Sequence, residues 1–200
     1  MNREEWLQEA VEQMRPLFVG IGSPLPPLRV SCSWPSARAL GRKTRAIGEC
    51  FFGTQSADKM PQLFISPLLA DEVDPQGVLP TLLHECAHVV AGFDAKHGPR
   101  FAKLAHKLGL EGKPTATYAG EATIDRMKQI VAKLGKYPHS QIIPLEREKK
   151  QGTRMIKCVC GDCGYIARTV KKWLNEQGSL ICPCNKLPMG FDILEDLDGN

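Results

Sequence analysis

Hydrophobic residues recur at helical spacing in four segments of the chain, separated by shorter runs that have the character of strands. The spacing predicts helices over residues 3–15, 78–91, 99–109 and 121–134. Asn2 and Glu5 resemble a capping pair at the start of the first helix, and Pro16 is expected to end it.

Three strand-like runs stand between the first and second helices, at residues 28–34, 45–53 and 62–69. They are separated by Gly, Ser, Asp and Pro, which is typical of a small and largely antiparallel sheet. Separate runs of strands and helices indicate the α+β fold class.

Beyond the last predicted helix the chain becomes polar and irregular. It contains Pro138, Pro144 and the run EREKKQG, which are typical of a linker. We therefore expect a first domain over 1–136, a linker over 137–154, a cysteine-rich module over 155–189 and an acidic tail over 190–200.

Composition agrees with one packed domain and a small appendage. The chain has 200 residues, of which 42% are hydrophobic and 24% charged, as in ordinary globular proteins. No apolar run approaches the roughly 20 residues of a membrane-spanning helix. The N-terminal MNREEWLQEA has no apolar signal-peptide core. We expect a cytoplasmic protein with no membrane partner.

The stretch LLHECAHVV, residues 82–90, carries the chemistry of a metal site. Residues four apart share a helix face, so His84 and His88 can present both imidazoles to one ion. Zinc lowers the pKa of a bound water to about 7 and polarises a scissile carbonyl. Glu85 is placed to act as general base on that water and to pass its proton to the leaving amine. The motif predicts a zinc-dependent metallopeptidase, because these polar residues interrupt an apolar run where they would be costly if unpaired.

A third protein ligand is expected, because a catalytic zinc usually has three. The extended pattern HExxHxxGxxH fails, since Ala91 and Asp94 stand where Gly and His are required. Glu121 on the next predicted helix is an alternative that nothing local favours. His97 is the better candidate, because it follows a glycine-containing turn that could return the chain to the metal.

Three other polar residues are not expected to bind the metal. His106 is expected on an exposed helix face, and His139 is expected in the linker. Tyr118 could donate a hydrogen bond to a developing oxyanion, although a tyrosine in a loop is more often simply packed.

Five of the eight cysteines fall within the last 43 residues, in MIKCVCGDCGY and LICPCNK. Such spacing, without an export signal, indicates a structural zinc rather than disulfides. We assign the ligands as Cys160, Cys163, Cys182 and Cys184, with Cys158 as an alternative ligand in the first knuckle. A redox dithiol is the competing interpretation. The remaining thiols are expected to be buried and inert: Cys32, Cys50 and Cys86.

Positive charge gathers in this second module. Residues 151–189 carry six Lys or Arg against two Asp or Glu, a local net charge of +4, and residues 190–200 carry four acidic residues. This balance favours an anionic partner, although solvated surface charge is an equal alternative. The residues that could contact nucleic acid are Arg154, Lys157, Arg168, Lys171, Lys172 and Trp173. Trp173 could stack on a base, but the core of so small a module is the favoured place for it.

Taken together, HECAH followed eight residues later by HGPRF, a linker and a cysteine-rich ribbon resembles the SprT-like metallopeptidase family, which includes the proteases of DNA–protein crosslinks. The resemblance covers about residues 28–189. It implies a zincin-like domain with a C-terminal zinc ribbon, one catalytic zinc on His84, His88 and His97 with Glu85 catalytic, and one structural zinc. It also implies a protein substrate associated with single- or double-stranded DNA, and hence a nucleoid-associated location. The extra Cys158 and the Cys-x-Cys closing knuckle depart from the usual ribbon.

Two other functions remain open from the residues. The ribbon could dock protein substrates without nucleic acid, or the chain could be a non-enzymatic zinc-ribbon adaptor. The intact Glu85 speaks against the adaptor, because a purely structural site has no use for that carboxylate.

Overall fold

The structure is a computed structural model that describes residues 1–36, 38, 45–144 and 155–191. The chain forms two compact units, Met1–Pro144 and Leu145–Asn200. Within the described ranges, no helix is both long and apolar enough to cross a membrane. The mixture of helices with small sheets confirms the α+β class.

Helix α1 (Arg3–Gly20) begins as predicted, with the Asn2 side chain accepting from the Glu5 backbone and the Glu5 side chain accepting in return. Its predicted end was wrong, because Pro16 lies inside the helix. Proline removes one backbone donor, but continuing the helix buries Phe18 completely. Burial of that aromatic ring offsets the lost hydrogen bond.

The first sheet has the order β1 (Arg29–Cys32), β3 (Gln62–Ile65), β2 (Gly48–Phe51). Strand β2 is antiparallel to β3, but β1 is parallel to it, so the predicted antiparallel character holds for only one of the two pairs. A parallel pair needs a long crossover connection. Residues 33–61, which include β2 and the short 3₁₀ turn Gly53–Gln55, supply it.

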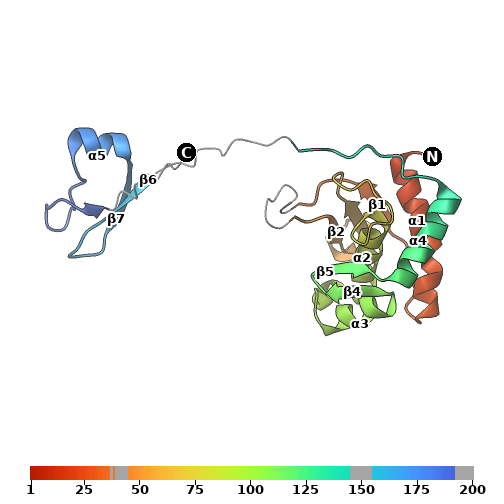
Figure 1. The fold of residues 1–200 in the computed structure, drawn as a ribbon. Coiled ribbons are helices and arrows are strands. Elements are labelled where there is room, and N and C mark those ends of the chain that lie inside the picture. Colours follow the sequence, from red (N-terminus) through yellow and green to blue (C-terminus); the bar gives the residue numbers. More distant parts are fainter. Residues whose placement is uncertain (37, 39–44, 145–154, 192–200) are drawn as a thin grey trace. The chain divides into compact units, whose positions relative to one another are not determined.

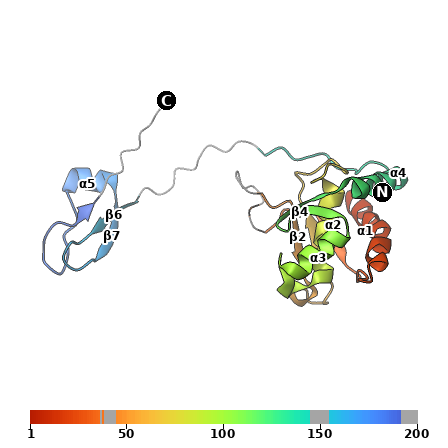
Figure 2. The ribbon, with the colours of Figure 1, turned by 60° about the horizontal axis from the view of Figure 1, so that its bottom comes forward.

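Helices α2 (Val78–Ala91) and α4 (Glu121–Leu134) have the predicted bounds, and α3 (Pro99–Lys107) ends two residues early. Figures 1 and 2 show α1 and α4 side by side, and α2 in the centre of the unit. Strand β2 and helix α3 both contact α2. These contacts hold α2 in place and so fix the direction in which its side chains point.

A hairpin of β4 (Leu110–Lys113) and β5 (Ala116–Ala119) follows α3 and was not predicted. Only its end residues, Leu110 and Ala119, are buried, so its sequence lacks the alternation that marks a strand. A residue with a side chain would fit poorly at Gly112, where the backbone has a φ of +88° and the Tyr118 ring lies close by.

Residues 137–144, expected to begin the linker, instead pack on the first unit. Tyr137 is buried and its backbone N–H donates to the Glu72 carboxylate at 2.7 Å. His139 is half-buried, with Nε2 2.9 Å from the Pro67 carbonyl oxygen, so it packs on the first unit and does not lie in a linker as predicted. Residues 145–154 lie outside the described ranges.

The second unit contains β6 (Met155–Val159), β7 (Ile166–Val170), helix α5 (Lys171–Gln177) and β8 (Gly190–Phe191), with sheet order β7-β6-β8. Strand β8 carries the sheet past the predicted boundary at 189. The remainder of the acidic tail, 192–200, lies outside the described ranges.

Candidate metal centres and nucleic-acid interface

Three imidazoles converge in the first unit. Helix α2 carries His84 and His88 one turn apart, and His97 precedes α3. The Nε2 atom of His88 lies 3.1 Å from Nε2 of His84 and 3.1 Å from Nε2 of His97. Three nitrogen atoms that converge on one point in this way could hold a metal ion.

The spacing of these nitrogens fits zinc. Ligand nitrogens about 2.0–2.1 Å from a tetrahedral ion lie about 3.4 Å from one another, close to the 3.1 Å of both pairs that include His88. Imidazole nitrogen is also a preferred ligand type for this ion. The three histidines expected to share an ion are therefore brought together.

The chain returns His97 to the site through a tight turn. Gly92 ends α2 with a φ of +85°, and the short 3₁₀ turn Phe93–Ala95 follows. Lys96 also has a positive φ, +45°, which a residue with a side chain rarely adopts. Such strain concentrates at functional positions, and here it directly precedes the imidazole that completes the group.

An apolar wall supports the imidazoles. Phe101 of α3 is fully buried and stacks on His88, with ring centroids 4.1 Å apart. Desolvation by burial lowers the pKa of His84 to about 4 and of His88 to about 3, and it also lowers the pKa of His97. Neutral imidazoles are the form that binds metal, so this environment prepares the group for an ion.

Thr117 of β5 makes a contact with His84 that the sequence did not reveal. Its Oγ1 lies 2.8 Å from Nδ1 of His84. With Nε2 directed to a metal, Nδ1 carries the proton and donates to the hydroxyl, which fixes the ring orientation. Thr117 belongs to the hairpin that lacked a strand pattern, so no local signal marked it.

Glu85 is buried beside the imidazoles. Desolvation and the charge of Glu49 raise its pKa to about 8. The start of β2 approaches this carboxyl closely: a Cβ added at Gly48 would lie 2.5 Å from Oε1 of Glu85 and 2.8 Å from Cγ2 of Thr81. The absence of a side chain at residue 48 therefore makes the space for the carboxyl group.

Three other polar residues of this region do not join the three-histidine group. Glu121 is an exposed residue at the start of α4 and does not belong to the three-histidine group. His106 is exposed, as expected. Tyr118 follows Thr117 on β5, and successive side chains on a strand point to opposite faces. Its ring lies over Gly112, so the predicted contact with an oxyanion is not supported.

Four thiols form a second group, in the ribbon. The Sγ–Sγ distances are 3.7 Å for Cys160–Cys184, 3.6 Å for Cys163–Cys182 and 3.4 Å for Cys182–Cys184. Sulfurs about 2.3 Å from a tetrahedral zinc lie about 3.8 Å apart. The four predicted ligands could therefore hold one metal ion.

Cys158, the alternative ligand, lies outside this group. It is fully buried on β6 within the small core of the ribbon. Backbone N–H groups of Cys163 and Asp162 lower the pKa of Cys160 to about 7, which favours the thiolate that binds metal. The geometry therefore favours Cys160 and Cys163, and not Cys158, as the ligands from the first knuckle.

Of the thiols in the first unit, Cys86 is buried and Cys32 and Cys50 are half-buried against the core. Desolvation raises the pKa of all three. The predicted burial is therefore confirmed for Cys86 only, while the raised pKa of all three disfavours the reactive thiolate.

The predicted nucleic-acid residues that the structure describes are exposed on the hairpin and on α5. Lys157 and Arg168 are directly opposed on β6 and β7, and both are exposed. Lys171 and Lys172 are exposed on α5. The sixth residue, Arg154, lies outside the described ranges.

The expectation that Trp173 lies in the ribbon core was wrong. Its side chain is 50% exposed, and the Lys172 ammonium lies 5.0 Å from its ring centroid. Leu174, the next residue along α5, is buried and packs with the metal-site thiols. One position along a helix turns a side chain by about 100°, so a single residue decides which of the two faces inward.

No protein-family model, curated protein or solved structure matches the chain.

Proposed function

We propose that this chain is a zinc-dependent metallopeptidase of the SprT-like type, acting on proteins associated with DNA. The observation that supports the peptidase is the convergence of His84, His88 and His97, with the buried Glu85 on the same helix. A metal site with three histidine ligands keeps one position open for a substrate.

The chain's own residues have distinct roles in this proposal. His84, His88 and His97 would hold the ion, which supplies Lewis-acid polarisation of a scissile carbonyl and a lowered pKa for water. Glu85 takes the proton of the attacking water and passes it to the leaving amine. Burial raises the pKa of Glu85 toward neutral pH, the range in which one carboxyl group can both accept and release a proton. The wall formed by Phe101 keeps one side of the site dry.

The test combines metal analysis with proteolysis of casein or histone by the full chain. We expect two zinc ions per chain, and cleavage that Glu85→Gln abolishes without loss of zinc. Glu121→Gln is the matched control, because this exposed glutamate lies outside the three-histidine group. Wild-type cleavage rates in Glu85→Gln would refute the mechanism, and zinc-loaded protein inert toward every protein substrate would leave a non-enzymatic adaptor.

The DNA component of the proposal rests on the ribbon and on the family resemblance. The opposed Lys157 and Arg168 place two cations side by side, at the spacing of a cross-strand pair. The exposed Trp173 offers a ring for base stacking. We expect single-stranded DNA to stimulate cleavage and to bind the chain with an affinity that falls steeply with salt, because phosphate contacts release counterions.

The second candidate function is docking of protein substrates on the ribbon. It is favoured by exposed apolar side chains on the hairpin face that carries Lys157 and Arg168. Met155 and Val170 are opposed beside the basic pair, and both are exposed, as is Ile166. Apolar side chains gathered in this way favour a protein partner. Cleavage that is indifferent to DNA, with no measurable DNA binding, would favour this candidate over the first.

A further inference from the structure

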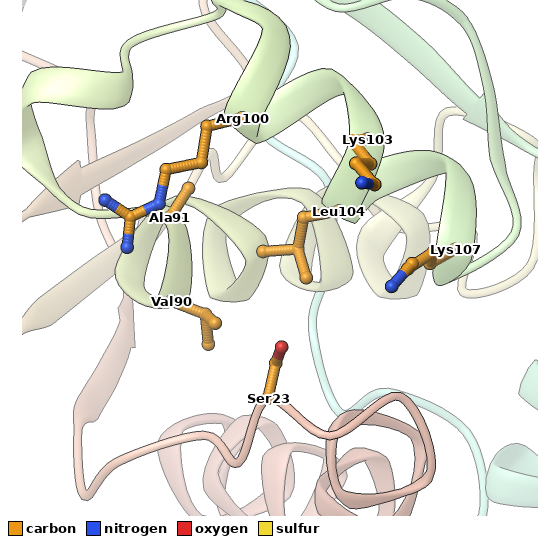
Figure 3. Close-up of a pocket in the computed structure, with 7 residues that line it drawn as sticks. All are labelled: Ser23, Val90, Ala91, Arg100, Lys103, Leu104 and Lys107. Carbon is orange, nitrogen blue, oxygen red and sulfur yellow. The ribbon is translucent and has the colours of Figure 1, made fainter.

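A separate pocket of the first unit lies between α2, α3 and the loop that follows α1 (Figure 3). Its volume is about 190 Å³. Three basic residues of α3 line it: Arg100, Lys103 and Lys107. The spacing of three and four residues places them on one face of the helix. All three line the same hollow, with the guanidinium of Arg100 beside Ala91 and the two lysines on the other side of Leu104 (Figure 3).

The rest of the pocket is apolar apart from one hydroxyl. Val90 and Ala91, at the end of α2, and Leu104 of α3 form apolar parts of its wall. Ser23 approaches from the loop after α1, with its hydroxyl directed toward Leu104 (Figure 3). The pocket therefore combines a positive rim, an apolar wall and one hydrogen-bonding group contributed by a different segment.

The three cations have no carboxylate partner in the part of the chain that the structure describes. The ion pairs there involve other residues, and no hydrogen bond is formed by Arg100, Lys103 or Lys107 side chains. Like charges three or four residues apart destabilise a helix. An anionic ligand bound in the hollow would offset the repulsion between the three cations.

The charge and the size of the pocket limit the ligand. A carboxylate brings one negative charge, which leaves two of the three cations uncompensated, whereas a phosphate brings up to two and has oxygens on several sides. The guanidinium of Arg100 can bind a phosphate through two parallel hydrogen bonds, and lysines bind it as point charges. The volume lies below the roughly 300–1,000 Å³ of sites that enclose drug-sized ligands, so one anionic group with a small attachment fits.

We infer that this pocket binds a phosphate group, held by Arg100, Lys103 and Lys107 with Ser23 as a further hydrogen-bond partner. The phosphate belongs either to a small phosphate compound or to the backbone of a nucleic acid, and the chemistry of recognition is the same. The inference does not depend on peptidase activity, because none of these residues belongs to the three-histidine group.

The test uses the full chain and two probes at constant ionic strength, inorganic phosphate and a short single-stranded oligonucleotide. A variant with glutamine at all three α3 positions removes the positive rim. The control carries the same three-charge change on α4, at the exposed Arg126, Lys128 and Lys133. Binding is measured by calorimetry and by the NMR shift of the Ser23 amide.

We expect saturable phosphate binding that weakens at least about tenfold in the α3 variant and little in the α4 variant, because charge-assisted hydrogen bonds are lost only in the first. If the α3 variant also weakens oligonucleotide binding more than the α4 variant does, the phosphate of the natural ligand belongs to a nucleic acid backbone. If it does not, the ligand is a small phosphate compound. The absence of saturable phosphate binding, or an equal loss in both variants, would overturn the inference. Glu85→Gln should bind phosphate as the wild type does, so failure of the peptidase proposal would be seen separately.

Discussion

Replacing Gly48 by alanine provides a sharp test of how the carboxyl group of Glu85 is positioned. The added Cβ would lie 2.5 Å from Oε1 and 2.9 Å from Cδ of Glu85. An ordinary contact begins near 3.4 Å, so the carboxyl group must move by about 0.9 Å, since overlap of this size is strongly repulsive. The three atoms nearest to the new methyl group belong to Glu85 and Thr81, and none belongs to an imidazole.

The expected result is a large loss of activity together with a moderate loss of stability. A displacement of about 1 Å at a catalytic group can cost about 10²-fold in rate, which corresponds to about 2.7 kcal/mol of activation free energy. The added Cβ would also lie 2.8 Å from Cγ2 of the buried Thr81. Overpacking of this kind should lower the free energy of unfolding by about 1–3 kcal/mol, partly offset because alanine restricts the unfolded chain more than glycine does.

The assay measures kcat/KM for peptide cleavage, zinc content and the midpoint of thermal unfolding for Gly48→Ala beside Gly20→Ala. At Gly20 a Cβ meets nothing within 4 Å, so this control should keep full activity. Full activity in Gly48→Ala at an unchanged unfolding temperature would refute the reasoning. Loss of zinc from Gly48→Ala would show instead that the strand, and not only the carboxyl group, had moved.

Three further outcomes follow from the same structure. Thr117→Val should weaken zinc binding about 10–100-fold in a chelator competition, because it removes the partner of a ligand imidazole, and Thr117→Ser should retain the affinity. Zinc affinity of the three-histidine site should fall much less between pH 7 and pH 5.5 than it would for three ordinary imidazoles. Burial holds the pKa of His84 near 4 and of His88 near 3, so protons compete at these two ligands only below those values, and burial lowers the pKa of His97 as well. Each imidazole with an ordinary pKa of about 6.5 would instead cost about tenfold at pH 5.5. Complete removal of zinc should abolish amide protection in 155–191 but retain it in the core of Met1–Pro144, as followed by hydrogen exchange, because the ribbon core contains few apolar side chains besides its cysteines.

Strong helical periodicity allowed the bounds of α2 and α4 to be predicted from the sequence to the residue. The same approach failed where tertiary contacts outweigh local preference. Pro16 does not end α1, because the helix continues to bury Phe18. The hairpin Leu110–Ala119 escaped prediction, because nearly all of its side chains face solvent and leave no alternation to detect.

The sequence by itself determined which residues could bind metal, since the i, i+4 spacing of His84 and His88 needs only a helix to place both imidazoles on one face. Partners that are distant in sequence were decided by the tertiary structure alone. Thr117 reaches His84 across 33 residues, and Gly48 meets Glu85 across 37. Such contacts depend on how separate segments pack, and their residue types carry no local mark of it. The phosphate pocket likewise exists only because the loop after α1 packs beside α3, where it adds a hydroxyl to a basic helix face.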